Sequence, residues 1–187
     1  MSQPSANDTK QSLDASLRHV LVVGGTLQQW AETTEQAWSE RVMALGTYCS
    51  SVGVPWLTLR AYELGADEQS EDLKLWTRSF DGCEVVVDPT GDGRQRFADA
   101  MMRLDSTDEV NEASVASVLY EPADCEPDLV VVLGPSTRLP PSLVWELAYA
   151  ELVFVSVPWM RFGADDLALA IGAFAQRRRR FGGLSDE

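Results

Sequence analysis

The chain has 187 residues and a formal net charge of −14, and 45% of its residues are hydrophobic, an ordinary value for one globular domain. The negative charge argues against nucleic-acid binding, which needs clustered Lys and Arg, and against adsorption to an anionic membrane surface. The three cysteines are scattered without a Cys-x-x-Cys pair, which favours reduced thiols, and with the single histidine, His19, they leave little material for a metal cluster or a Ser-His-Asp triad.

Residues 1–17 are polar and lack the apolar core of a signal peptide, so we expect a disordered N-terminal tail followed by one domain over residues 18–187. The longest apolar stretch, Leu143–Trp159, is interrupted by two glutamates and a proline and is a poor candidate for a membrane span. The sequence therefore predicts a cytoplasmic protein that reaches a membrane only through a partner.

Short β-branched runs alternate with helical patterns along the domain. The predicted strands are His19–Val23, Trp56–Ala61, Glu84–Asp88, Ser114–Tyr120, Leu129–Leu133 and Val153–Val157. The predicted helices cover Trp38–Val52, Glu71–Phe80, Asp92–Leu104, Ser142–Leu152 and Asp165–Arg180, and the segments Glu63–Glu71 and Asp105–Glu112 are expected to be acidic surface loops. This alternation predicts a single α/β domain with a mostly parallel six-stranded sheet flanked by helices.

The first predicted strand ends in Val23-Gly24-Gly25-Thr26 and leads into a helix. Backbone amides at such a turn can bind a phosphate. The spacing is neither Gly-x-Gly-x-x-Gly nor a P-loop, so a tight turn that needs glycine is favoured over a nucleotide site.

Three segments, Pro127–Gly134, Leu143–Leu152 and Arg178–Gly183, follow one another in an order that resembles the C-terminal half of the cis-prenyltransferases, the undecaprenyl diphosphate synthase family. The resemblance extends from His19 to Gly183 and is weak in the middle, where the chain is shorter than the family's enzymes. Those enzymes use helices in that region to wall a hydrophobic tunnel. The resemblance implies a cis-prenyltransferase-like fold that is shortened in the middle.

The family's essential aspartate, which is tied to magnesium and to the departure of diphosphate, is replaced by Gly25. Gln29 stands where the family has a phosphate-binding arginine. Glycine has no side chain and Mg²⁺ requires hard oxygen ligands, so the resemblance implies that the chain has no catalytic residue of its own.

A second family motif, which binds isopentenyl diphosphate, is also reduced. In an alignment without gaps, Val132, Ser136 and Pro140 replace its first arginine, its glutamate and its serine, whereas Arg138 remains at the second arginine position. The resemblance implies phosphate binding by Arg138 and a vestigial metal-binding role for Glu151, which falls on the family's late acidic residue. Surface charge and helix support are equally open explanations for these two residues.

The ending Arg180-Phe181-Gly182 fits the Arg-x-Gly motif of the family and of its non-catalytic Nogo-B receptor-type subunits. In that family the tail crosses the dimer interface and contacts substrate phosphate in the partner's site. The resemblance implies phosphate binding by Arg180, Gly182 and Gly183. The alternative is that Arg177–Arg180 only neutralise the dipole at the end of the last helix.

Together these features predict a non-catalytic subunit of a heteromeric cis-prenyltransferase. An active homologue would supply the Mg²⁺ site, and isopentenyl and allylic diphosphates would be bound through the complex. One alternative is a repurposed homodimer that binds an isoprenoid diphosphate or a protein without chemistry. Another is an enzyme with a relocated carboxylate, such as Glu63 or Asp92, which is disfavoured because catalysis requires such a group to be placed closely.

Overall fold

A computed structural model describes residues 17–62, 73–104, 109–134 and 136–181. The strands are β1 His19–Val23, β2 Trp56–Arg60, β3 Trp76–Phe80, β4 Cys83–Asp88, β5 Leu129–Leu133 and β6 Glu151–Val155. The helices are α2 Leu27–Glu32, α3 Glu35–Ser51, α4 Gly93–Arg103, α5 Glu112–Tyr120 and α6 Ala164–Phe181, with two short 3₁₀ helices, η1 Glu146–Ala148 and η2 Trp159–Arg161.

The six strands form one sheet in the order β3-β4-β2-β1-β5-β6. All neighbouring pairs are parallel except β3 with β4, which is antiparallel. The carboxyl ends of the five parallel strands therefore meet at one edge, where open α/β sheets bind their ligands. The predicted fold class, a single α/β domain with a mostly parallel six-stranded sheet, is confirmed.

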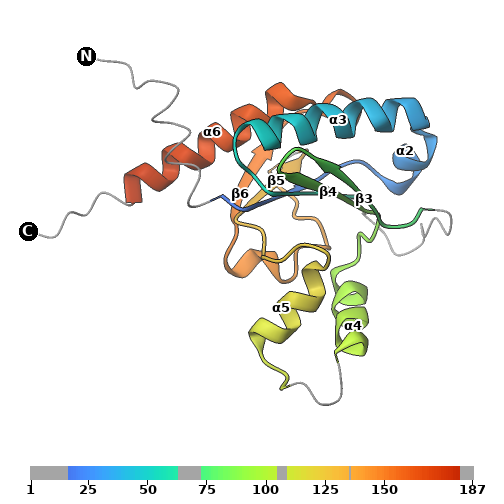
Figure 1. Ribbon diagram of the computed structural model, residues 1–187, viewed down its shortest axis with the longest axis vertical. Coiled ribbons are helices and arrows are strands. Elements are labelled where there is room, and N and C mark those ends of the chain that lie inside the picture. Colours follow the sequence, from blue (N-terminus) through green and yellow to red (C-terminus); the bar gives the residue numbers. More distant parts are fainter. Residues whose placement is uncertain (1–16, 63–72, 105–108, 135, 182–187) are drawn as a thin grey trace, which may run out of the picture.

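Helices cover both faces of this sheet. Figure 1 shows α3 and α6 side by side on one face and the pair α4 and α5 on the other. Alternate side chains of β1 point to opposite faces of the sheet. Val20 and Val22 pack in the large core under α3 and α6, whereas Leu21 and Val23 pack in a smaller core on the opposite face. Burial on both faces explains why the strand is apolar throughout.

The predicted strand Ser114–Tyr120 was wrong, because these residues belong to helix α5. The side chain of Asn111 accepts a hydrogen bond from the Ser114 amide, and the Ser114 hydroxyl accepts one from the Asn111 amide. This capping box starts a helix, which then buries Val115 and Leu119 one turn apart.

The predicted helix Glu71–Phe80 was also wrong where the structure describes it, because Trp76–Phe80 is strand β3. A two-residue loop, Asp81-Gly82, connects it to β4, and Phe80 pairs with Cys83. Gly82 has a φ of 82°, a left-handed conformation that favours glycine.

The predicted helix Ser142–Leu152 is replaced by turns, the 3₁₀ helix η1 and the start of β6. Of the two glutamates in this segment, Glu146 is turned inward and buried between Arg60 and Arg96. A regular helix on the surface would instead leave this carboxylate exposed to water. The final strand consequently covers Glu151–Val155 rather than the predicted Val153–Val157.

The expected N-terminal tail lies outside the described residues except for Leu17, which is buried in the core and so belongs to the domain. The expected loop Glu63–Glu71 also lies outside them, and of the loop Asp105–Glu112 only its last residues are described, with Glu112 starting α5. Among the described helices, none has the length and apolar character needed to cross a bilayer.

Candidate functional site

The turn after β1 lies at the edge where the parallel strands end. Gly25 has a φ of 75°, a left-handed conformation that favours glycine. The next residue, Thr26, caps α2: its hydroxyl accepts a hydrogen bond from the Gln29 amide, while the Gln29 side chain accepts one from the Thr26 amide. The Gln29 side chain therefore serves to start the helix.

Two indole rings fill the space above Gly25. A Cβ atom added there would lie 2.7 Å from Trp30 Nε1 and 2.7 Å from Trp159 Cγ. The two rings are stacked with their centroids 5.3 Å apart, and both side chains are buried. An aspartate at this position would therefore need a strained backbone and a displaced tryptophan pair.

The tryptophans are held in place by polar and cationic contacts. Trp30 Nε1 donates to the Gly24 carbonyl at 3.0 Å, and Trp38 Nε1 donates to the Trp30 carbonyl at 3.2 Å. The Arg41 guanidinium carbon lies 4.4 Å from the ring centroid of Trp159. The surroundings of Gly25 are thus indole carbon and nitrogen, which does not fit Mg²⁺, an ion that prefers carboxylate, phosphate and water oxygens.

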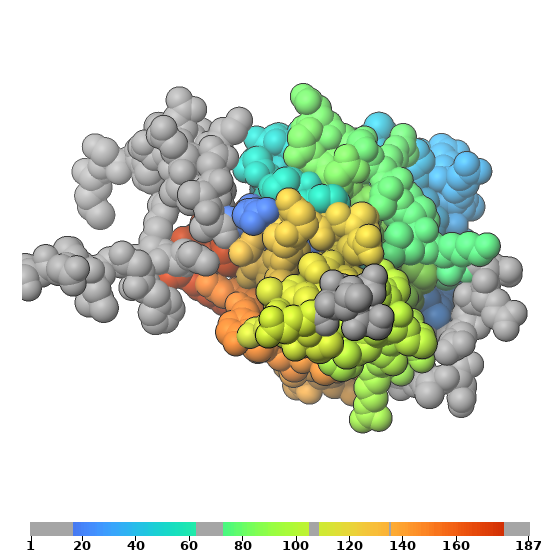
Figure 2. All heavy atoms as spheres, turned by 60° about the horizontal axis from the view of Figure 1, so that its bottom comes forward, coloured from blue at the N-terminus to red at the C-terminus, as the bar shows by residue number. Residues whose placement is uncertain are grey.

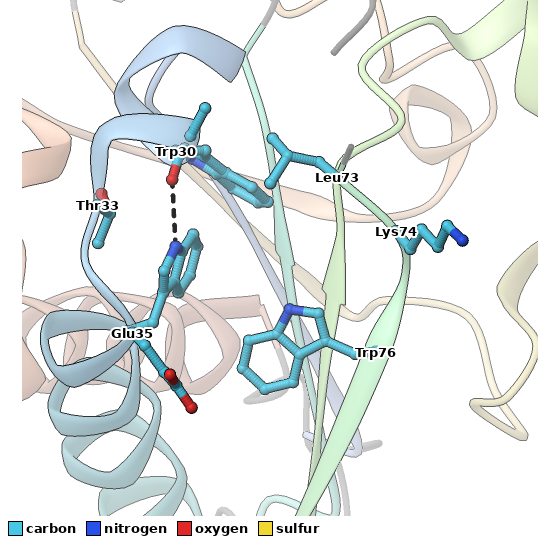
Figure 3. A pocket seen from close by; sticks show the side chains of 8 residues that line it. Trp30, Thr33, Glu35, Leu73, Lys74 and Trp76 are labelled. Atoms are coloured by element: carbon cyan, nitrogen blue, oxygen red, sulfur yellow. Dashed lines mark hydrogen bonds between the residues drawn. The ribbon is translucent and has the colours of Figure 1, made fainter. Parts of the chain in front are cut away.

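A pocket of about 460 Å³ opens beside this cluster, between the α2–α3 connection and the start of β3. Trp30, Trp38, Leu73 and Trp76 form most of its apolar wall. Figure 3 shows Trp30, Leu73 and Trp76 around the cavity, whereas Lys74 extends away from it. The indole N–H groups of Trp30 and Trp38 are already bonded to backbone carbonyls. The pocket therefore offers mainly hydrocarbon surface to a ligand.

Four buried charged residues form a closed ionic cluster at the same edge. Arg60 ends β2 and Asp88 ends β4, while Arg96 comes from α4 and Glu146 from η1. Arg60 contacts Asp88 at 3.2 Å and Glu146 at 2.7 Å. Arg96 contacts the same carboxylates at 3.6 Å and 3.1 Å, so two positive and two negative charges are balanced.

The surrounding charges favour the ionised forms of Glu146 and Arg60 despite their burial. Burial alone raises the pKa of Glu146, but the nearby charges of Arg60 and Arg96 and the hydrogen bond from Arg60 outweigh it and lower the pKa. Burial likewise lowers the pKa of Arg60, yet Glu146 and Asp88 raise it overall. Buried charges are tolerated when they are paired in this way.

His19 lies at the opposite edge of the sheet, where β1 begins. Its Nδ1 donates to the Cys125 carbonyl and its Nε2 accepts from the Thr58 hydroxyl, both at 2.8 Å. Burial lowers the pKa of His19 to about 4. The ring is therefore neutral and joins β1, β2 and the segment before β5.

The structure places the two predicted charged site residues at different edges. Arg138 is exposed and follows β5, so it shares the edge of the Gly24–Gly25 turn. Glu151 is the first residue of β6 and pairs with Leu129, the first residue of β5, so it lies at the other edge. Its carboxylate faces Arg177 of α6 at 4.0 Å.

The C-terminal motif is described only in part. Helix α6 continues to Phe181, the side chain of Arg180 is not among the described ones, and Gly182 and Gly183 lie outside the described residues. Glu63, one of the alternative carboxylates, lies outside them as well. The other, Asp92, caps α4 and accepts a hydrogen bond from the Arg94 amide at 2.8 Å.

Sequence reasoning missed the ionic cluster. A signal was present, because Arg60 and Asp88 each end a strand that is otherwise largely apolar. Charges at the carboxyl ends of neighbouring parallel strands must lie close together. The partners Arg96 and Glu146 carried no such signal, since each lies inside a segment that was predicted to be a helix, Asp92–Leu104 and Ser142–Leu152.

Residues 66–182 match the family model described as "Putative undecaprenyl diphosphate synthase", and the chain belongs to this prenyltransferase family. The "Isoprenyl transferase" of Thermotoga maritima is 27% identical over 95% of this chain and 83% of its own length. That of Neisseria gonorrhoeae is 31% identical over 63% of this chain and 48% of its own. A (2E,6E)-farnesyl-diphosphate specific ditrans,polycis-undecaprenyl-diphosphate synthase from Legionella pneumophila is 41% identical over 42% of this chain and 33% of its own.

Solved structures of two relatives have the same fold. A probable undecaprenyl diphosphate synthase from Campylobacter jejuni aligns with a TM-score of 0.57 and 19% identity, over 89% of this chain and 98% of that one. Lavandulyl diphosphate synthase from Lavandula x intermedia aligns with a TM-score of 0.61 and 15% identity, over 86% and 95%. At these identities the likeness concerns the fold alone.

Proposed function

We propose that this chain is a non-catalytic subunit of a heteromeric cis-prenyltransferase and pairs with an active homologue. The observation that carries the proposal is the filled space above Gly25, where Trp30 and Trp159 occupy the room that a carboxylate would need. The partner would hold the Mg²⁺ and condense isopentenyl diphosphate with an allylic diphosphate. Arg180, with the glycines that follow it, would contribute to the partner's phosphate site.

An exposed apolar surface supports a partner. Helix α4 lies beside the segment that follows β5, since Phe97 stacks on Trp145 and the Gly93 amide donates to the Pro141 carbonyl. Figure 2 shows the atoms of α4 and α5 on this face, next to the orange atoms of the later segment. The exposed large apolar side chains of α4 and of this later segment are Phe97, Met101, Met102, Leu139, Val144, Leu147 and Tyr149. Such a patch is typical of a protein interface.

The test is capture of the tagged chain from its native cytosol, followed by mass spectrometry and a Mg²⁺-dependent prenyltransferase assay. We expect an active cis-prenyltransferase in the eluate, and no polyprenyl diphosphate synthesis by the purified chain alone. Arg180→Ala should lower turnover of the complex without dissociating it, whereas Arg161→Ala, a matched exposed arginine, should have no effect. Robust turnover by the isolated chain would overturn the proposal.

The apolar pocket favours one second candidate, a homodimer that binds an isoprenoid diphosphate without chemistry. Titration of farnesyl diphosphate would then quench tryptophan fluorescence, and inorganic diphosphate would not. Trp76→Ala should abolish the quenching, whereas Trp145→Ala, which lies outside the pocket, should retain it. Quenching by a chain that captures no active synthase would favour this function over the accessory subunit.

A further inference from the structure

Glu146 interrupts an exposed apolar segment in an unusual way. The twelve residues of Leu139–Ala150 contain one charged residue, Glu146, and it is only 3% exposed. Its apolar neighbours Val144, Leu147 and Tyr149 are 58%, 46% and 74% exposed. Globular proteins normally show the reverse order, with the carboxylate in water and the apolar side chains inside.

The buried carboxylate is the main polar anchor of this segment. One oxygen, Glu146 Oε1, accepts from both Arg60 and Arg96. The arginines are themselves held in place, because Arg60 also contacts Asp88, and Arg96 donates to the Leu119 carbonyl. Glu146 thereby ties the segment to β2, α4 and the end of α5.

The segment has little local structure that could fix its shape. Its 3₁₀ helix contains three residues, and an isolated helical turn is unstable in water. Trp145, the residue before Glu146, donates a hydrogen bond to Glu126 and stacks on Phe97. Two side chains anchor the segment inward, Leu143 in the smaller apolar core and Glu146 in the ionic cluster. Val144 and Leu147, beside them in the sequence, are exposed.

We propose that Glu146 is the positioning residue of the partner-binding surface, acting through the placement of Val144, Leu147 and Tyr149. This inference rests on the proposed function, and the occupant of the surface is a homologous chain of the same family. Charge supports a protein occupant. The protein carries a net charge of −14, yet this segment exposes no charge, and depletion of charged residues is typical of the core of a protein–protein interface.

The test uses the full-length chain and the cis-prenyltransferase that it captures, purified separately. Glu146→Gln preserves size and removes the charge, leaving two guanidinium groups with the single carboxylate of Asp88. We expect the dissociation constant of the complex to rise at least tenfold. Glu121→Gln is the matched control, because its carboxylate pairs with Arg103 on the surface and does not contact the segment; its affinity should be unchanged.

A double-mutant cycle with Leu147→Ala separates positioning from a general loss of structure. In the wild type Leu147→Ala should weaken binding, and in the Glu146→Gln background it should have little further effect, because the side chain is already displaced. Additive effects, or equal affinity of Glu146→Gln and wild type, would overturn the inference while leaving the proposed function intact. A wild-type chain that binds no homologue would overturn both.

Circular dichroism and urea unfolding establish that each variant is folded before its affinity is measured. Glu146→Asp is the second variant, for use if Glu146→Gln does not fold. It keeps the charge but shortens the side chain by one methylene, so it should weaken binding less than Glu146→Gln and show the same non-additivity with Leu147→Ala. Additivity in this variant would count equally against the inference.

Discussion

Two single residues, Gly25 and His19, have surroundings that determine their roles in the structure. At Gly25 the space beside the backbone is occupied by Trp30 and Trp159. Trp30 is fixed by a hydrogen bond to the Gly24 carbonyl, whereas Trp159 is held by stacking on Trp30 and by the Arg41 guanidinium over its ring. The packing around Gly25 therefore leaves no room for a larger side chain unless the two indoles move. His19 is a residue of another kind, since its neutral ring joins three segments of the chain.

Gly25→Ala should destabilise the protein more than Gly82→Ala, although both glycines have a positive φ. A Cβ at Gly82 would meet nothing within 4 Å, so that variant measures the backbone cost alone, about 1–2 kcal/mol. At Gly25 the collision with two indoles should add about 1–3 kcal/mol. Urea unfolding of the two variants measures the difference, and equal losses would contradict the packing argument.

Gly25→Asp should not give the isolated chain prenyl-transfer activity, because the new carboxylate has no room beside Trp30 and Trp159. The measurement is a Mg²⁺-dependent assay with isopentenyl and farnesyl diphosphates. Activity in this variant would show that the tryptophans move aside readily.

The stability of the protein should fall as the pH is lowered from about 6.5 to about 4, partly because of His19. In this window the unfolded chain binds a proton on the imidazole and the folded chain does not, so protonation favours unfolding. The loss should be roughly 3 kcal/mol from this group and should level off below the folded pKa. His19→Gln, compared by urea unfolding at pH 7 and pH 4.5, should show a smaller change; an unchanged pH dependence would exclude His19 as the cause.

At the scale of helices and strands, some elements could be predicted from the sequence and others could not. The strands His19–Val23 and Leu129–Leu133 were predicted with their observed bounds, because strands buried on both faces are apolar throughout. Two wrong assignments, the helix Glu71–Phe80 and the strand Ser114–Tyr120, arose where a turn or a helix cap of a few residues disagreed with the pattern of the longer segment beside it. The Asp81-Gly82 turn identifies a hairpin and Asn111 caps a helix, yet the flanking residues suggested the opposite structures.

The segment that contains Glu146 could not be assigned from its own residues. Its apolar residues do recur at helical intervals. The burial of Glu146, however, depends on two arginines distant in the sequence, Arg60 and Arg96. The candidate site was likewise only partly predictable. The absence of a carboxylate at Gly25 was visible, whereas the stacking of Trp30 and Trp159 over it depends on tertiary structure.

Gly46→Ala should destabilise the contact between α3 and the β3 edge. Alanine normally stabilises a helix by about 1 kcal/mol relative to glycine. Here the added Cβ would lie 2.3 Å from the Phe80 ring, so we expect a net loss of about 1–2 kcal/mol. Gly172→Ala in α6, where nothing lies within 4 Å, should instead raise the thermal midpoint. A gain in stability from both variants would contradict this account.

At the scale of the whole molecule, the net charge and the exposed apolar surface have opposite effects on association with other chains. A net charge of −14 keeps copies of the chain apart, whereas the exposed apolar surface of α4 and Leu139–Ala150 favours association.

We expect the urea midpoint of the isolated chain to rise when NaCl is increased from 0.05 to 0.5 M. Salt screens repulsion among the exposed carboxylates, but it has little effect on the buried ionic cluster. KCl should have the same effect if screening is the cause, and a lower midpoint in both salts would contradict it.

The hairpin at the β3 edge has a consequence for how the chain folds. Parallel neighbours such as β1 and β5 can pair only after most of the sequence between them has been brought together, as in the register of Val20 with Leu129. β3 and β4 need only close the Asp81-Gly82 loop, a step that takes microseconds and costs little chain entropy. The β3–β4 edge of the sheet can therefore form early, independently of the long-range pairing on which the rest of the sheet depends.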